Sequence, residues 1–306
     1  VDTAIPHIPV TAHGLKENGY ATIATTNWLP YSWSINNVAF AEVMHTALSY
    51  FQAGRADAGY KLLKSSVLDG MYLGDSPGNF GQISFYDAAR GECYRDFGDP
   101  IGVASRVLIQ GLFGILPDAL NQQIILRPGF PDDWDKASVS TPDISYRFTR
   151  KEDTDTYHIT QRFQTPLHPV LQINARKEKI RSVKVNDVPA TWQSIESAHG
   201  YPLLSIQAEG TSSTTITIEW EGAPLHTLAA QEPVIASNGK LALQIPSGAS
   251  ISQVYDPQSV LAKHTMGATA FNAQIKGEPG HHTFFVYTHQ GEMDWWQPVN
   301  IYIENT

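Results

Sequence analysis

The sequence predicts an α+β protein, with helices in its N-terminal third followed by antiparallel β-sandwich structure. Apolar residues recur with the 3.6-residue period of a helix before residue 117, and with the two-residue period of a strand after residue 140. Turn residues separate the later segments at short intervals, which is typical of a β-sandwich. The length of 306 residues suits two or three domains, which we expect at residues 1–122, 123–222 and 223–306.

Three amphipathic helices are expected in the N-terminal part. From Phe40 to Phe51 apolar residues follow at i, i+3, i+4, i+7, i+8 and i+11, which is one face of a helix. A second helix is expected over residues 55–72. A third begins at Asp99, which caps it before a proline at the first helical position, and Pro117 stops it.

Three helices do not close a helical domain of their own, because each has a broad apolar face that further helices would have to cover. We therefore expect residues 1–122 to be the last helices of a larger helical barrel. The chain begins at Val1 and shows no signal peptide, so we expect it to be a C-terminal fragment of a longer protein.

The rest of the chain has the pattern of short strands. Every second residue from Ile144 to Phe148 is apolar, and a turn at residues 151–156 leads into the next strand, as in a hairpin. An Asn-Asp turn at residues 186–187 predicts another hairpin. More short strands are expected after residue 224.

Composition and charge exclude several classes of protein. The chain has 42% hydrophobic and 17% charged residues, which suits a folded protein with a sizeable core. Its formal net charge of -9 and the lack of a basic stripe argue against nucleic acid as a partner. No apolar run is long enough to span a membrane. The single cysteine, Cys93, rules out an internal disulfide framework.

Aromatic and amide side chains gather just before the first expected helix, in residues 27–37. Sugars are bound by aromatic rings that stack on their C–H surfaces and by amides that both donate and accept hydrogen bonds. The alternative is a well-packed entry loop with capping asparagines. The candidate sugar-binding residues are Trp28, Tyr31, Trp33, Asn36 and Asn37.

A second polar and aromatic segment is the non-periodic loop of residues 74–98. A loop of this length inside a compact domain is usually functional. Its carboxylates alternate with arginines and tyrosines, which suits general acid–base work on a glycosidic bond. The alternative is a salt-bridged structural loop. The candidate site residues of the loop are Asn79, Arg90, Glu92, Tyr94, Arg95 and Asp96.

Several short sequence motifs resemble those of a known group of enzymes. The third expected helix ends in Gly-Leu-Phe-Gly-Ile-Leu-Pro-Asp at residues 111–118, and Pro-Asp-Asp-Trp follows at residues 131–134. With the long loop and the Asp-Pro helix start, this is similar to the C-terminal part of six-hairpin glycoside hydrolases of the glucoamylase-like and rhamnosidase-like families. The resemblance covers about residues 20–222.

The resemblance implies a fold, a site and a location. Residues 1–122 would be the last helices of an (α/α)6 barrel. The catalytic base of these families lies in the loop before the final barrel helix, which makes Glu92 the first candidate and Asp96 the second. Their general acid lies further upstream, in the missing N-terminal part of the barrel. The families are typical of the bacterial periplasm or extracellular space.

The predicted function is hydrolysis of a glycosidic bond, exo-acting on an oligosaccharide, with no cofactor. No metal site is expected, because His281, His282 and His289 lack a carboxylate at ligand spacing. The main alternative is a non-catalytic carbohydrate-binding or structural module. A lyase or phosphorylase is a third possibility. Trp295 and Trp296 suit either a sugar-stacking platform or packing between domains, and we favour packing.

Overall fold

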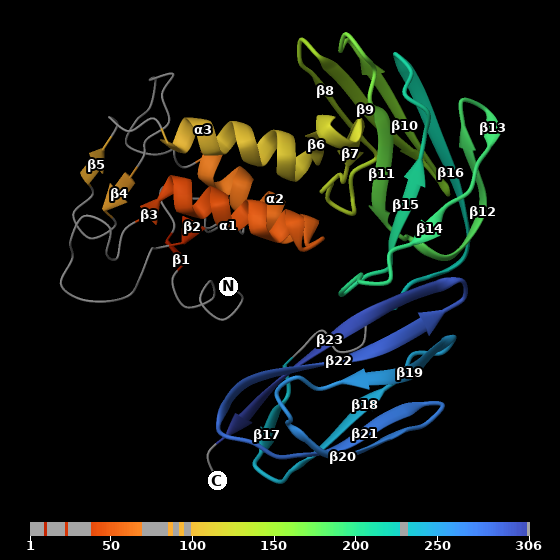
Figure 1. Cartoon of the computed structure of the whole chain (residues 1–306). Helices are drawn as coiled ribbons and strands as arrows, with labels where there is room; N and C mark the ends of the chain where they lie inside the picture. The colour runs from red at the N-terminus through yellow and green to blue at the C-terminus, as the bar shows by residue number, and fades with distance from the viewer. Residues whose placement is uncertain are drawn as a thin grey trace. The chain divides into compact units, whose positions relative to one another are not determined.

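The computed structural model describes residues 9–10, 22–23, 38–68, 85–87, 92–94, 99–226 and 232–304. The chain divides into two compact units, Val1–Trp134 and Asp135–Thr306. Figure 1 shows all described helices in the first unit and only strands, with their connections, in the second.

The expected fold class is wrong in its helical part. Most described residues lie in strands, and the described α-helices are only three: α1 (Phe40–Gln52), α2 (Ala56–Val67) and α3 (Asp99–Arg106), which continues as a π-helical segment, η4 (Val107–Leu112). The described part of the chain therefore does not form the last helices of an (α/α)6 barrel.

The physical reason lies in how the helices cover each other. Helix α1 contacts α2, α3 and η4, so its apolar face is buried within the first unit. Phe40 and Met44 of α1 have no exposed surface, and Leu63 of α2 is 6% exposed. The large apolar residues that stay exposed on the described helices are Ile101 of α3, Leu108 of η4 and Leu120 in residues 119–121. Further barrel helices are thus not needed to bury α1.

The first unit also contains short strands. They are β1 (Pro9–Val10), β2 (Thr22–Ile23), β3 (Val38–Ala39), β4 (Phe85–Asp87), β5 (Glu92–Tyr94), β6 (Ile115–Asp118) and β7 (Gln123–Leu126). Strands β1 and β2 pair with each other, β3, β4 and β5 form one antiparallel sheet, and β6 and β7 form a hairpin around the short 3-10 helix η5 (Ala119–Asn121).

The Pro-Asp-Asp-Trp motif at residues 131–134 has a structural role in this unit. The ring of Trp134 stands edge-on to Tyr60 of α2, with 4.9 Å between centroids, and stacks on Phe130 at 6.1 Å. The backbone N–H of Asp132 donates a hydrogen bond of 3.3 Å to Asp57 at the start of α2. These contacts attach residues 130–134 to one helix.

From residue 123 onward every described element is a strand, as the two-residue period predicts. In the second unit, the first β region holds β8 (Lys136–Ser140), β9 (Ile144–Lys151), β10 (Thr154–Gln161), β11 (His168–Asn174), β12 (Lys177–Val185), β13 (Val188–Pro189), β14 (Gln193–Ser194), β15 (Leu203–Gln207) and β16 (Ser213–Pro224). One antiparallel sheet has the order β13-β12-β16-β10-β9-β8, and β14, β15 and β11 are hydrogen-bonded in that order. Ile216, Ile218 and Trp220 of β16 are buried at alternate positions.

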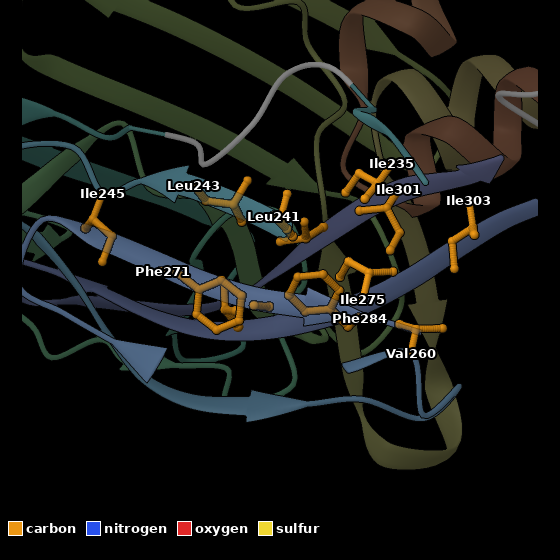
Figure 2. Close-up of a cluster of buried hydrophobic side chains, with 13 residues drawn as sticks. Ile235, Leu241, Leu243, Ile245, Val260, Phe271, Ile275, Phe284, Ile301 and Ile303 are labelled. Carbon is orange, nitrogen blue, oxygen red and sulfur yellow. The ribbon is translucent and has the colours of Figure 1, made fainter. Parts of the chain in front are cut away.

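The second β region comprises β17 (Val234–Ala236), β18 (Lys240–Gln244), β19 (Ala249–Tyr255), β20 (Leu261–Met266), β21 (Ala270–Ile275), β22 (Gly280–Gln290) and β23 (Met293–Glu304). It has two sheets, β17-β23-β22-β19 and β18-β21-β20. Side chains from both sheets meet in one apolar core (Figure 2), where the rings of Phe271 and Phe284 stack with 5.6 Å between centroids. This region is a small β-sandwich with its own core.

The two β regions touch at two places within the second unit. The carboxylate of Glu178 in β12 accepts hydrogen bonds from the backbone N–H of Ala223 at 3.0 Å and from the side chain of Gln290 in β22 at 3.2 Å. The backbone N–H of Trp296 in β23 donates to Ala198 at 2.9 Å, and Gly200 donates to Trp296 at 2.8 Å. Among the described helices, none has the length and apolar character that a membrane span requires.

Candidate functional site

A three-stranded sheet in the first unit links the loop at residues 74–98 to the two residues that directly follow the segment at residues 27–37. Strand β3 follows directly after residues 27–37, and it pairs with β4 through Val38 opposite Tyr86. Strand β4 pairs in turn with β5, where Asp87 lies opposite Glu92. The backbone of Glu92 is therefore two strands away from the residue that follows the aromatic and amide segment.

Two helices start beside this sheet in the chain. Strand β3 runs into α1 without an intervening residue, and α3 begins five residues after β5 ends. The first backbone N–H groups of a helix have no partner within the helix and carry a partial positive charge, which favours nearby carboxylates and polar ligands. The start of α1, which is joined directly to β3, is therefore a suitable neighbour for a polar site.

The structure describes only part of the predicted site. Glu92 and Tyr94 are placed as backbone, in β5. The other predicted site residues lie outside the described residues, and their roles stay predictions: Trp28, Tyr31, Trp33, Asn36, Asn37, Asn79, Arg90, Arg95 and Asp96.

A second group of candidate residues lies on the second β region; of these, sequence reasoning considered only Trp296 and favoured a packing role for it. Among the aromatic residues on the side of the β17-β23-β22-β19 sheet that faces away from its core, four lie together, and we call them the aromatic face: Tyr255, Phe285, Tyr287 and Trp296. Alternation along β22 and β23 was the available signal. It places Trp295 in the core, 1% exposed, and Trp296 outside, so the two tryptophans have different roles.

The aromatic face has a polar neighbour. Nδ1 of His289 contacts a carboxylate oxygen of Asp294, and Nε2 of His289 lies 2.7 Å from Oγ of Ser252. The ring of Tyr287 stands edge-on to His289 with 5.0 Å between centroids. Partial burial raises the pKa of the Tyr287 hydroxyl, and the negative charges of Asp294 and Glu196 add to this rise. The Tyr287 hydroxyl therefore stays protonated and can donate a hydrogen bond.

Comparisons with known proteins give partial likenesses of fold. No family model matches the sequence, and a search of curated proteins gave no match. An alpha-L-rhamnosidase from Dictyoglumus thermophilum is similar over 59% of this chain, with 12% identity and a TM-score of 0.39. The chain covers 21% of that enzyme's length. Tandem Ig repeats of Dlar are similar over 50% of this chain, with 10% identity and a TM-score of 0.19.

Proposed function

We propose that this chain is part of a glycoside hydrolase that removes sugar units from the end of an oligosaccharide, with Glu92 as its general base. One observation supports the proposal above others. The aromatic and amide segment at residues 27–37 and the carboxylate-rich loop at residues 74–98 each have the composition of a sugar site. Strand β3, which begins directly after the first segment, pairs with β4 of the loop, and β4 pairs with β5, which contains Glu92.

The chemistry follows from the residue types. The Glu92 carboxylate takes a proton from a water molecule, which attacks the anomeric carbon of the sugar. A general acid outside this chain protonates the leaving oxygen. The configuration at the anomeric carbon is then inverted, and the two carboxyl groups lie about 6.5–9.5 Å apart. Asp96 is the second candidate for the base.

The remaining predicted residues hold the sugar. Trp28, Tyr31, Trp33 and Tyr94 stack on its ring or enclose it, because aromatic faces match the C–H surface of a pyranose. Hydroxyl groups bind to amide and guanidinium side chains, for which the chain offers Asn36, Asn37, Asn79, Arg90 and Arg95. The two arginines also suit a sugar that carries a carboxylate, since the guanidinium fork pairs with carboxylate geometry.

The test uses the complete protein that contains this chain, assayed on a panel of aryl glycosides and oligosaccharides. Glu92→Gln keeps the size of the side chain and removes the charge, so we expect kcat to fall by about 10²–10⁴-fold while sugar binding survives. Glu209→Gln is the matched control, because Glu209 lies in the second unit and is 92% exposed. It should leave kcat unchanged.

Two results would change the assignment. Loss of activity in Asp96→Asn with an active Glu92→Gln would make Asp96 the base. If both variants stay as active as the wild type, the hydrolase proposal is wrong, and a non-catalytic carbohydrate-binding protein replaces it.

A further inference from the structure

The aromatic face results from strand alternation in the second β region. On β22, Phe284 and Val286 have no exposed surface and point into the core, so Phe285 and Tyr287 point outward. The register places Tyr287 opposite Trp296 and Phe285 opposite Tyr255. Four rings thus lie over the three neighbouring strands β19, β22 and β23, whose arrangement Figure 1 shows.

The four rings form one continuous surface. Tyr287 and Trp296 are 5.0 Å apart between ring centroids, Tyr255 and Phe285 are 6.1 Å apart, and Tyr255 and Trp296 are 6.4 Å apart. Tyr255 is 57% exposed, and the other three rings are half-buried. Large aromatic side chains at cross-strand positions usually lie in a core or at a binding surface. This group lies outside the core and partly against residues 198–200, and its exposed part at Tyr255 is the part that is open to a ligand.

The first β region borders the aromatic face on one side. The backbone of Trp296 exchanges two hydrogen bonds with residues 198 and 200, and the ring of His199 stands edge-on to Phe285 with 5.6 Å between centroids. The position of Trp296 is therefore supported by both β regions. A rigid aromatic surface loses little conformational entropy when a ligand binds to it.

A polar group borders the face where β22 turns into β23. Ser252 is exposed, and its hydroxyl contacts His289, which contacts Asp294. Together with the Tyr287 hydroxyl, these side chains offer both donors and acceptors of hydrogen bonds within reach of the rings. Sugar hydroxyl groups need this combination.

The charged residues near the aromatic face limit the chemical class of ligand that can bind there. Strands β19, β22 and β23 contain no Lys or Arg, so they offer no permanently charged cation of the kind that binds a phosphate, a sulfate or a nucleic acid backbone. The carboxylate of Asp294 is engaged by His289. An uncharged ligand with a flat apolar side and several hydroxyl groups fits both the rings and the polar border.

We propose that the aromatic face of the second β region is a binding site for a neutral oligosaccharide. A pyranose ring stacks on the exposed ring of Tyr255, with the edge-on ring of Trp296 beside it, and hydroxyl groups of the oligosaccharide bond to the polar border at Ser252. This site lies in a different unit from Glu92 and does not depend on the proposed hydrolysis. It would hold a polysaccharide by non-catalytic contacts.

The test is affinity electrophoresis of the whole chain in gels that contain one soluble polysaccharide each. Xylan, glucomannan and galactan are the neutral probes, and polygalacturonate and heparin are the anionic ones. We expect at least one neutral probe to retard the wild type and the anionic probes not to. Tyr255→Ala and Trp296→Ala should each weaken retardation by about tenfold or more. Ser252→Ala should weaken it by a smaller factor.

Three controls separate binding from folding. Tyr255→Phe keeps the ring and should keep binding. Met266→Ala removes an apolar side chain that is 45% exposed on the other sheet of the same region, and it should bind like the wild type. Circular dichroism should show that Tyr255→Ala is folded, because Tyr255 is largely exposed. Glu92→Gln should leave retardation unchanged, so failure of this proposal is distinguishable from failure of the hydrolase proposal.

Several outcomes would overturn the inference. No retardation of the wild type by any neutral probe would do so, as would equal retardation of the wild type and Tyr255→Ala. Sedimentation that shows a wild-type dimer and a monomeric Tyr255→Ala would make the face a self-association surface.

Ser252, His289 and Asp294 also have the hydrogen-bond order of a serine hydrolase. Hydrolysis of p-nitrophenyl acetate that disappears in Ser252→Ala would replace sugar binding by acyl transfer.

Discussion

The indole N–H of Trp220 donates a hydrogen bond of 3.1 Å to Asp155, and both residues are only 1% exposed. The other carboxylate oxygen of Asp155 accepts hydrogen bonds of 2.9 Å from Arg150 and from Arg176. A buried carboxylate is costly unless it is paired and hydrogen-bonded, and here three donors satisfy it. Burial, followed by the charge of Asp155, raises the pKa of the neighbouring Tyr157 hydroxyl far above its ordinary value.

Removing this carboxylate should destabilise the first β region. Asp155→Ala removes the acceptor that the Trp220 N–H, Arg150 and Arg176 share, so we expect a loss of about 3 kcal/mol or more in the free energy of unfolding, measured in urea. Asp155→Asn should lose less, because the amide oxygen can still accept one hydrogen bond. Asp153→Asn is the control. Asp153 pairs with Lys177 at 2.8 Å on the surface, and the loss of this ion pair should barely change the midpoint of urea unfolding.

Gly114 should not tolerate a side chain. It has a φ of +65°, and a Cβ atom there would lie 1.8 Å from the backbone oxygen of Arg127. Gly114→Ala would therefore force the β6–β7 hairpin apart, and we expect a loss of about 2 kcal/mol or more in urea unfolding. The matched control is Gly102→Ala in α3, where no atom beyond the neighbouring helix backbone lies within 4 Å of the new Cβ. Alanine should add about 0.5–1 kcal/mol there, because it restricts the unfolded chain.

The second β region should depend on its own core. Phe271 has no exposed surface and stacks on Phe284, so Phe271→Ala should cost about 3–5 kcal/mol in the free energy of unfolding. Met266→Ala lies on the neighbouring strand with a 45% exposed side chain, and its effect should stay within about 0.5 kcal/mol. Equal losses in the two variants would contradict the assignment of Phe271 to the core.

The spacing of the apolar residues predicted the helices and strands well. The pattern from Phe40 to Phe51 coincides with α1, because a 3.6-residue period is the geometry of a helix. The alternation of apolar residues that ends at Trp220 coincides with the buried side of β16, because successive side chains of a strand point to opposite faces of the sheet. The end of the third helix was less predictable. The chain changes to π-helical geometry at Val107, leaves the helix before Gly114, and enters β6 at Ile115.

The arrangement of elements could not be read from the period. A helical pattern shows that α1 has an apolar face but not which neighbours cover it, so burial of Phe40 and Met44 by the unit itself was not foreseen. Trp295 and Trp296 posed the same problem, because the sequence does not show which of the two points into the core. The strand register places Trp295 inside. The candidate site is the hardest part, because the loop at residues 74–98 has no period. Its composition indicates chemistry without indicating where each side chain points.

Acid should weaken the contact at Glu178 between the two β regions. The backbone N–H of Ala223, followed by the amide of Gln290, holds the pKa of the Glu178 carboxyl below its usual 4.5. A carboxyl whose pKa is lower in the folded state contributes stability above its unfolded pKa, and this contribution is lost as the pH falls through the folded value. The loss should therefore begin below about pH 4.5.

The measurement compares urea midpoints of the wild type and Glu178→Gln between pH 7 and pH 3. Glutamine keeps an acceptor for Ala223 but removes the charge, so the variant should be less stable at pH 7, and the two curves should converge below pH 4.5 as the wild-type carboxyl takes up its proton. Asp153, whose pKa is also lowered, titrates in both proteins and cancels in the difference. Glu209→Gln, with its 92% exposed side chain, controls for the loss of one negative charge. A difference between wild type and Glu178→Gln that stays constant from pH 7 to pH 3 would show that the charge of Glu178 does not stabilise this contact.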